Sequence, residues 1–211
     1  GQPWIRYDST RPTVWRLPLR YAVQPALTVT APATGYFVPS AHAAWMSEKL
    51  ALHGIDFQRF IAPQPASVVQ TFRADRTTTA AETFEGRSLM TVDGAWRDET
   101  RDIGPGALFV PIAQPKARLV MSLLEPQAPD SFVSWGYFST AFERKEYMEN
   151  YVTEAVARQM LSQDPALKAE FERRLREDTA FAGNPDARLE FFHRRHPSWD
   201  ERYGLYPVYR K

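Results

Sequence analysis

The chain has 211 residues, of which 44% are hydrophobic, 13% aromatic and 24% charged, as in a folded globular protein with a sizeable core. Its formal net charge of +1 gives no overall field to attract nucleic acid, and its lack of cysteine excludes disulfides, iron–sulfur clusters and cysteine-ligated zinc. No apolar run is as long as the roughly 18 residues that a transmembrane helix needs, so we expect no membrane span.

The first half of the chain, residues 1–113, is predicted to be rich in strands. Apolar and polar residues alternate over 15–21 and again over 27–30, which is the period of a β-strand. Pro18 would place the first of these strands at a sheet edge. Asp93-Gly94 is typical of a tight hairpin turn. Other strands are predicted over 35–39, 68–72, 89–92, 95–96 and 107–112.

Helices are predicted mainly in the second half, residues 114–211. One helix of the first half, 41–53, is expected to end at Gly54 and to turn Met46 and Leu50 inward. Further helices are predicted from Pro115 to a point before Pro126, from Thr140 through Met160, from Pro165 onward, and from Pro185 to a point before Pro197. The longest of them has capping-box spacing at Thr140–Glu143 and an apolar stripe of Met148, Tyr151, Val152, Ala155, Val156 and Met160.

These elements predict an α+β fold. A mostly antiparallel sheet or small sandwich from residues 13–112 is expected to pack against helices from residues 114–195. We expect the two halves to share one core and to form a single domain. The C-terminal segment 203–209 is expected to lie back across the body, because exposing its many apolar groups would be unfavourable.

No motif for catalysis or metal binding is found. None of the four histidines begins a His-x-x-Glu pattern; they are His42, His53, His193 and His196. We expect His53 to contact the end of its helix, and the His193–His196 segment to form a solvated basic helix end. Nucleotide-binding glycine loops and a Gly-x-Ser-x-Gly elbow are absent from the sequence. We therefore predict no catalytic residue and no metal ligand, although a Ser-His-Asp arrangement of unrecognised geometry stays open.

The segment from Leu123 to Phe138 has two interpretations. In the first it is a binding surface, with Trp135 or Tyr137 as the anchor and Glu125 or Asp130 as the polar contact. In the second it is a packed loop, in which the aromatic rings are buried and the carboxylates hydrogen-bond to backbone amides. We favour the packed loop and keep these four residues as the candidate binding site.

Two other sets of side chains suggest binding. The aromatic residues Trp4, Tyr7, Trp15 and Tyr21 suit stacking on a sugar, but they equally suit a core or a contact with another domain. The arginines Arg16, Arg20, Arg73 and Arg76 suggest a basic face. Because the charge is balanced elsewhere, the arginines are weak support for nucleic-acid binding.

Several short stretches resemble the C-terminal region of large bacterial zinc carboxypeptidase-like proteins of the M14 metallopeptidase family. In the second half they are 114–115, 123–126, 130–131, 134–138, Phe142-Glu143, Glu146-Tyr147, Tyr151-Val152, 187–189, 191–192, 195–197, 199–200 and 206–208. In the first half they are 29–32, Tyr36, 38–39 and 52–55. The resemblance covers most of the chain, and residues 60–103 match only loosely.

The resemblance implies a context rather than a catalytic site. In such proteins the zinc lies in an upstream peptidase domain, so the cofactor would belong to that domain and none to this chain. The implied partner is the upstream domain of the same polypeptide, and the implied location is secreted or periplasmic. The implied function is an accessory domain that stabilises or orients the peptidase domain. The alternatives are a binding module for cell-wall peptide or glycan, and an independent hydrolase.

Overall fold

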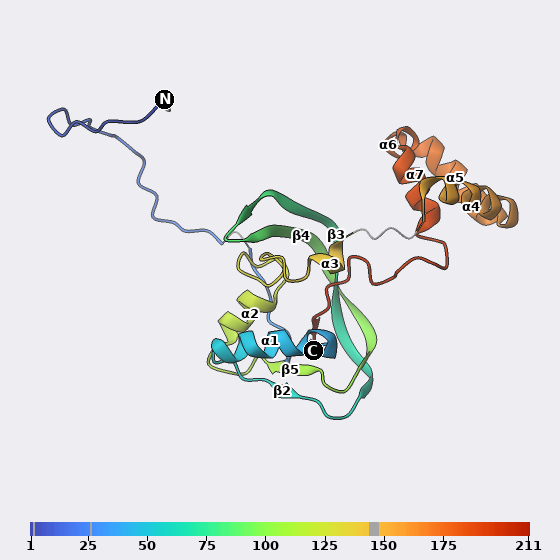
Figure 1. Cartoon of the computed structure of the whole chain (residues 1–211), viewed down its shortest axis with the longest axis horizontal. Helices are drawn as coiled ribbons and strands as arrows, with labels where there is room; N and C mark the ends of the chain where they lie inside the picture. The colour runs from blue at the N-terminus through green and yellow to red at the C-terminus, as the bar shows by residue number, and fades with distance from the viewer. Residues whose placement is uncertain (2, 26, 144–147) are drawn as a thin grey trace. The chain divides into compact units, whose positions relative to one another are not determined.

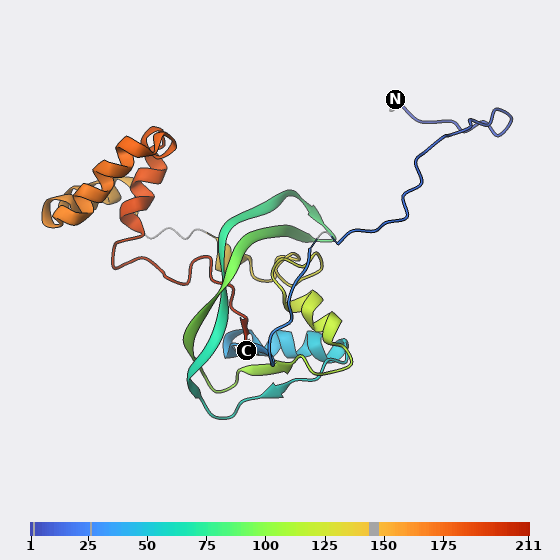
Figure 2. The ribbon, with the colours of Figure 1, turned by 180° about the vertical axis from the view of Figure 1, so that it is seen from behind.

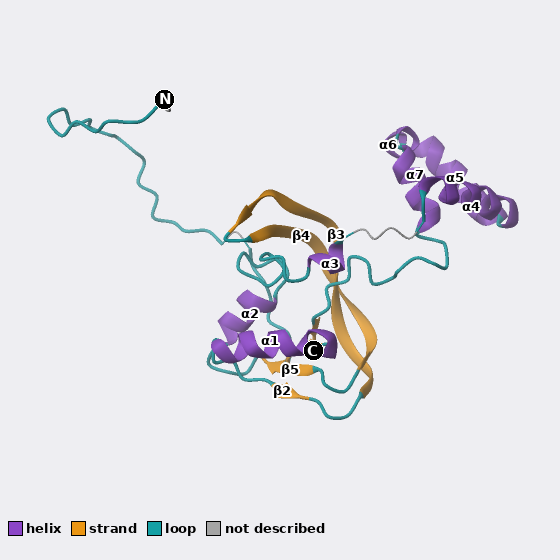
Figure 3. Cartoon of the chain, viewed as in Figure 1, coloured by secondary structure: helices purple, strands orange, loops and turns teal. Residues whose placement is uncertain are grey.

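A computed structural model describes every residue of the chain except 2, 26 and 144–147. The described residues form an α+β structure, which confirms the predicted fold class (Figures 1 and 3). Its strands are β1 (Gly35–Val38), β2 (Gln58–Arg59), β3 (Gln64–Phe84), β4 (Arg87–Ile103), β5 (Leu108–Pro111) and β6 (Tyr209–Arg210). Its helices are α1 (Ser40–Leu52), α2 (Ala117–Leu124), α3 (Ser139–Phe142), α4 (Asn150–Gln163), α5 (Pro165–Glu177), α6 (Thr179–Gly183) and α7 (Pro185–His193).

The strands pair in one antiparallel sheet in the order β2-β5-β1-β6-β3-β4. Strand β1 is buried on both faces, which its alternating side chains make possible. Tyr36 and Val38 belong to the main core, together with residues of α1 and α2. Phe37 belongs to a second, smaller cluster with Val69 and Ile103. The sheet therefore has apolar side chains packed on both sides of its centre.

Helix α1 confirms the helix predicted over 41–53. Met46 and Leu50 are fully buried on its inner side. After the helix the chain turns at Gly54, whose φ of 61° lies in the left-handed region. The amide of Ile55 donates to the carbonyl of Leu50 at 2.9 Å, and the amide of Gly54 donates to the carbonyl of Ala51 at 2.9 Å. This is the Schellman ending that a glycine after a helix favours.

Strands β3 and β4 form one long twisted hairpin (Figure 2). The predicted hairpin turn at Asp93-Gly94 is wrong, because the turn lies at Glu85 and Gly86, which have φ values of 49° and 74°. Gly94 lies inside β4, opposite Ala74, next to a bulge in β3. A Cβ atom at position 94 would stand 2.1 Å from the carbonyl oxygen of Arg73. The glycine therefore permits a close backbone approach and does not make a turn.

The strands predicted over 15–21 and 27–30 are wrong. The described residues of these segments contain no strand, and residues 1–30 form a unit separate from residues 31–211. The alternation of apolar and polar residues is compatible with a β-strand. A strand also needs a neighbouring strand that forms hydrogen bonds with its backbone amides and carbonyls. Pro18 also removes an amide donor from the middle of the alternating run.

Helices α4–α7 pack around an aromatic cluster of their own. Phe171 lies 4.7 Å from Phe192 and 5.4 Å from Phe191 between ring centroids. Helices α5, α6 and α7 each begin at a residue whose side chain accepts backbone hydrogen bonds; these are Asp164, Asp178 and Asn184. The Asp-Pro and Asn-Pro starts confirm the predicted beginnings of α5 and α7. No helix in the described part of the chain has the length and apolar character to cross a bilayer, as expected.

The prediction of one helix from Thr140 through Met160 is wrong. Helix α3 ends at Phe142, Glu143 is extended, and α4 begins at Asn150. The predicted capping box forms no side-chain cap, since α3 starts after Phe138 with none. Residues 144–147 of the prediction lie outside the described residues. The buried positions of α4 are Thr153 and Ala157, and Tyr151 of the predicted stripe is exposed.

The C-terminal segment returns to the body, as predicted. Leu205, Tyr206 and Val208 are buried, and Tyr206 belongs to the main core. Strand β6 then inserts between β1 and β3: Arg210 lies opposite Tyr36 on one side and opposite Gln70 on the other. The last residues of the chain therefore complete the centre of the sheet.

The close approach at Gly94 leads to a stability prediction. Gly94→Ala forces the new methyl group against the backbone of β3, so we expect a loss of about 1–3 kcal/mol in the free energy of unfolding. Gly104→Ala is the matched control, because a Cβ there meets nothing within 4 Å. Urea unfolding followed by tryptophan fluorescence measures both. Equal stability of the two variants would contradict the role given to Gly94.

Candidate functional site

Glu125, the first candidate polar contact, lies at the end of α2 and is only 2% exposed. Its Oε1 atom accepts a hydrogen bond of 2.5 Å from the hydroxyl of Tyr36 and one of 2.9 Å from Nε of Arg210. Its Oε2 atom accepts a second bond of 2.6 Å from Nη2 of Arg210. The carboxylate is thus held by a bidentate arginine and a phenol from two different strands. It points into the protein, and its bonding capacity is used in joining these strands.

Aromatic rings surround this ion pair. The guanidinium of Arg210 lies over the ring of Trp96, 4.2 Å from its centroid. The hydroxyl of Tyr206, which is fully buried, donates to the carbonyl of Leu124 at 3.0 Å. Burial, followed by the negative charge of Glu125, raises the pKa of Tyr36 far above its usual value. The phenol therefore stays protonated and keeps donating to the carboxylate.

Asp130 and Trp135 contact each other at the surface of the loop. The indole Nε1 of Trp135 donates to Oδ1 of Asp130 over 3.4 Å, which is long for a hydrogen bond. The ring of Trp135 also lies against Phe84 near the tip of the β3–β4 hairpin, with 6.1 Å between centroids. Asp130 is exposed and Trp135 is half-buried. These two residues brace the loop against the hairpin.

Tyr137, the other candidate anchor, stacks on the body of the protein. Its ring lies nearly parallel to that of Trp45, at 12° and 5.0 Å between centroids. The guanidinium carbon of Arg87 lies over the same ring at 3.7 Å from the centroid. Two partners from the chain itself thus already use the ring of Tyr137. The contacts of the four candidate residues favour the packed-loop interpretation.

His42 and His53 lie at opposite ends of α1, whereas His193 and His196 are neighbours at the end of α7, where the amide of His196 donates to the carbonyl of His193 at 3.1 Å. Because His193 is buried, the prediction of a solvated helix end is wrong for this residue. His42 packs edge-on against Phe138 at 5.1 Å, and burial lowers its pKa. His53 is at the end of α1, where its carbonyl accepts a hydrogen bond from Lys116. His193 is buried at the end of α7 beside Trp199, and Nδ1 of His196 is 2.7 Å from the hydroxyl of Ser198. Within the described residues no group of three or more histidine and acidic side chains is arranged to hold a metal ion.

An apolar arm makes up most of the separate N-terminal unit. We define the arm as residues 4–23; nine of its large apolar side chains are between 70% and 94% exposed. They are Trp4, Ile5, Tyr7, Val14, Trp15, Leu17, Leu19, Tyr21 and Val23. The arm also carries four arginines and one aspartate. Such a density of exposed apolar groups is typical of a surface that contacts another molecule.

Comparison of the chain with models of protein families, with curated proteins and with solved structures finds no match. The resemblance to zinc carboxypeptidase-like proteins therefore rests on the short stretches of sequence alone.

Sequence reasoning missed part of what the structure presents. Val14, Leu17, Leu19 and Val23 were assigned to the first half of the fold or left unassigned, yet they are among the most exposed apolar residues. The sequence does not single out Arg97, although this residue lines a surface groove together with Arg73 and Arg76. Only the pairing of β3 with β4 brings Arg97 to these residues, so no local pattern would have found it.

The two candidate carboxylates are expected to differ sharply in their effect on stability. Glu125→Gln leaves Arg210 buried without its counter-charge, so we expect a loss of about 3–5 kcal/mol in the free energy of unfolding. Asp130→Asn changes an exposed residue, and we expect a change within about 0.5 kcal/mol. Chemical denaturation of the two variants checks this. A Glu125→Gln protein as stable as the Asp130→Asn protein would contradict the structural role of Glu125.

The raised pKa of Tyr36 predicts how stability depends on pH. The folded state holds this phenol neutral, whereas the unfolded chain ionises it at a pKa of about 10. The stabilisation is thus complete below pH ~10 and is lost as the pH rises further, by at most about 1.4 kcal/mol per pH unit for this group.

Tyr36→Phe should therefore flatten the fall in stability between about pH 9.5 and pH 11. The variant is less stable at neutral pH because it lacks the hydrogen bond to Glu125. Tyr151→Phe, at an exposed position, is the control and should keep the slope of the original protein. Urea midpoints measured across this range give the slopes. The same slope in Tyr36→Phe and in the original protein would refute the assignment.

Proposed function

We propose that this chain is an accessory domain of a zinc carboxypeptidase-like protein and that it docks on the peptidase domain through the N-terminal arm. The observation that carries the docking is the set of nine large, exposed apolar side chains in residues 4–23. The resemblance to the M14 family supplies the identity of the partner. The role of the domain is to stabilise or orient the peptidase domain.

The energetics of the arm favour a partner. Burying one large apolar side chain contributes about 1.5–3 kcal/mol. Burial of the arm's exposed side chains against another molecule would therefore give a large favourable free energy of association. Residues 1–30 contribute no side chain to the buried cores among the described residues. A segment of this length is also too short to bury these groups within itself. A complementary apolar groove on another domain would bury them.

The pattern of the arm indicates how it docks. Trp15, Leu17, Leu19 and Tyr21 recur at every second position, so an extended arm presents them on one face. Arg16 and Arg20 fall on the opposite face. An extended segment of this kind suits addition to the edge of a sheet, where backbone hydrogen bonds and alternate side chains both contribute. The four arginines of the arm favour a partner surface with acidic residues around the groove.

The body of the domain supports a structural rather than a chemical role for its candidate site. Glu125 is engaged by Tyr36 and Arg210, and Tyr137 by Trp45 and Arg87. Cell-wall peptide or glycan binding through Trp135 and Tyr137 is the alternative. It would require these rings to exchange their present contacts for a ligand.

The docking proposal predicts that the arm binds the peptidase domain of the parent polypeptide. In titration calorimetry the 211-residue chain should bind that domain produced separately. Leu17→Ser with Leu19→Ser should weaken binding by about a hundredfold or more, since each change removes roughly 1.5–3 kcal/mol of apolar burial. Thr28→Ser with Thr30→Ser is the matched control, outside the arm, and should bind as the original does.

Two outcomes would count against docking through the arm. One is that the original chain does not bind the peptidase domain. The other is that the leucine and threonine variants bind it equally well. A parallel titration with peptidoglycan fragments tests the alternative, which requires saturable binding that Trp135→Ala abolishes.

A further inference from the structure

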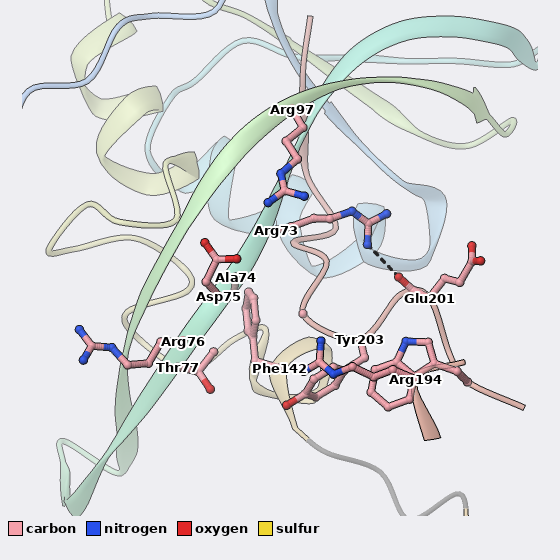
Figure 4. A pocket seen from close by; sticks show the side chains of 12 residues that line it. Arg73, Ala74, Asp75, Arg76, Thr77, Arg97, Phe142, Arg194, Glu201 and Tyr203 are labelled. Carbon is pink, nitrogen blue, oxygen red and sulfur yellow. Dashed lines mark hydrogen bonds between the residues drawn. The ribbon is translucent and has the colours of Figure 1, made fainter. Parts of the chain in front are cut away.

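A groove of about 620 Å³ runs along β3 and is independent of the arm. One wall is formed by strand residues, including Arg73, Arg76 and Arg97, and another by the C-terminal segment around Tyr203 (Figure 4). The C-terminal segment is fixed to β3, because the amide of Ala74 donates to the carbonyl of Gly204 at 2.8 Å. The strand side of the groove is therefore built on paired backbone, and Arg194, Trp199 and Glu201 line the groove from the segment that follows α7.

Arg73 is held in one position at the centre of this groove. Its Nε atom donates to Oε1 of Glu99 at 3.0 Å, and its Nη1 atom donates to the carbonyl of Glu201 at 2.9 Å. Glu99 is itself shared, since Arg101 binds its other oxygen. Partial burial opposes the charged form of Glu99, but the hydrogen bonds from Arg73 and Arg101 outweigh it and lower the pKa of this carboxyl. No described contact uses the Nη2 group of Arg73, so this group can donate to a ligand.

Arg97 adds a second guanidinium beside Arg73. Arg73 lies opposite Ala95 in the ladder and Arg97 lies opposite Thr71, so the two arginines are diagonal neighbours on one face of the hairpin. Figure 4 shows the side chain of Arg97 directed toward Arg73. No hydrogen bond or ion pair joins Arg97 to any residue that the structure describes.

The charges on this face do not cancel. Glu99 binds Arg73 and Arg101, and no described contact joins it to Arg97. Arg76, farther along the groove, is different because it is exposed and already paired with Asp93 at 2.5 Å. Arg194 also lines the groove and is paired with Glu190. Among the described arginines of the groove, the unpaired positive charge is therefore that of Arg97, a diagonal neighbour of Arg73, and neighbouring guanidinium groups repel each other unless an anion is present.

Other residues of the groove restrict the kind of anion. The ring of Tyr203 lines it and offers an apolar contact next to the arginines, whereas Phe142 is buried in the main core beneath it. The carboxylates of Asp75 and Glu201 also line it, and they repel a doubly charged phosphate more than a singly charged carboxylate. A planar carboxylate also matches the geometry of the guanidinium group.

We infer that the groove binds a small carboxylate ligand with a neighbouring apolar group, its carboxylate held between Arg73 and Arg97 and its apolar group against Tyr203. This function goes beyond docking through the arm and depends on different residues. Arg73 is the preorganised contact, since its position is fixed by Glu99 and the backbone of residue 201. Arg97 is the contact that supplies the uncompensated charge.

The probe for this site is N-acetylphenylalanine, which has one carboxylate and one ring. Its amide has the same shape and no charge, and serves as the matched control ligand. In NMR titrations of the 211-residue chain we expect the acid to bind at least about tenfold more tightly than the amide, because only the acid forms charge-assisted hydrogen bonds. Phenyl phosphate, the doubly charged comparison, should bind more weakly than the acid.

Variants locate the binding to these arginines. Arg97→Gln should weaken binding of the acid by about tenfold or more, and it is an exposed strand position whose change leaves the fold intact. Arg76→Gln is the control in the same groove and should change binding by less than about twofold, since Arg76 is exposed and paired with Asp93.

Three results would overturn the inference. They are equal binding of the acid and the amide, unchanged binding by Arg97→Gln, and no binding of the acid at millimolar concentration. Tighter binding of phenyl phosphate would reject the carboxylate class. Thermal unfolding of each variant verifies that its fold is unchanged.

Discussion

The buried carboxylate of Glu125 is the constraint on which the rest of the structure depends. A charge that is removed from water must find partners of opposite charge or strong donors, and here they come from β1 and β6. Strand β6 has only two residues, so its backbone pairing alone would be weak. Because Arg210 is anchored by Glu125, β6 stays between β1 and β3 and joins the short strands to the long β3–β4 hairpin.

The same C-terminal segment connects the core to the surface groove. Tyr206 fills the main core, and the amide of Tyr206 donates to the carbonyl of Phe72 in β3. Two residues earlier, Gly204 accepts from Ala74 and forms part of the groove that contains Arg73. The position of the groove wall is therefore set by the packing of Tyr206 and the ion pair of Arg210. The groove is a consequence of how the sheet closes.

The sequence predicts what local signals determine, and it misses what depends on distant partners. Gly54 ends α1 as predicted, because a left-handed turn after a helix involves only neighbouring residues. The alternation at 15–21 is equally regular, but it does not say whether a partner strand exists. The sequence does not decide whether Glu125 binds a ligand or packs in the core, because its partners Tyr36 and Arg210 are 89 and 85 positions away. The sequence predicts a turn at Gly94 for the same reason: the requirement for glycine there comes from the backbone of the facing strand β3, which is distant in the sequence.

The contrast between the arm and the body bears on function. Because the whole chain carries +1 and the first 30 residues carry four arginines and one aspartate, residues 31–211 have a formal net charge of −2. The body satisfies its buried charge internally through Glu125 and Arg210, whereas the arm leaves both its apolar and its basic side chains exposed. A segment that combines unburied rings with unpaired arginines gains from a partner that is apolar and acidic. A body with a closed core gains little from such a partner, except in the groove where Arg97 lies beside Arg73 without an ion pair among the described residues.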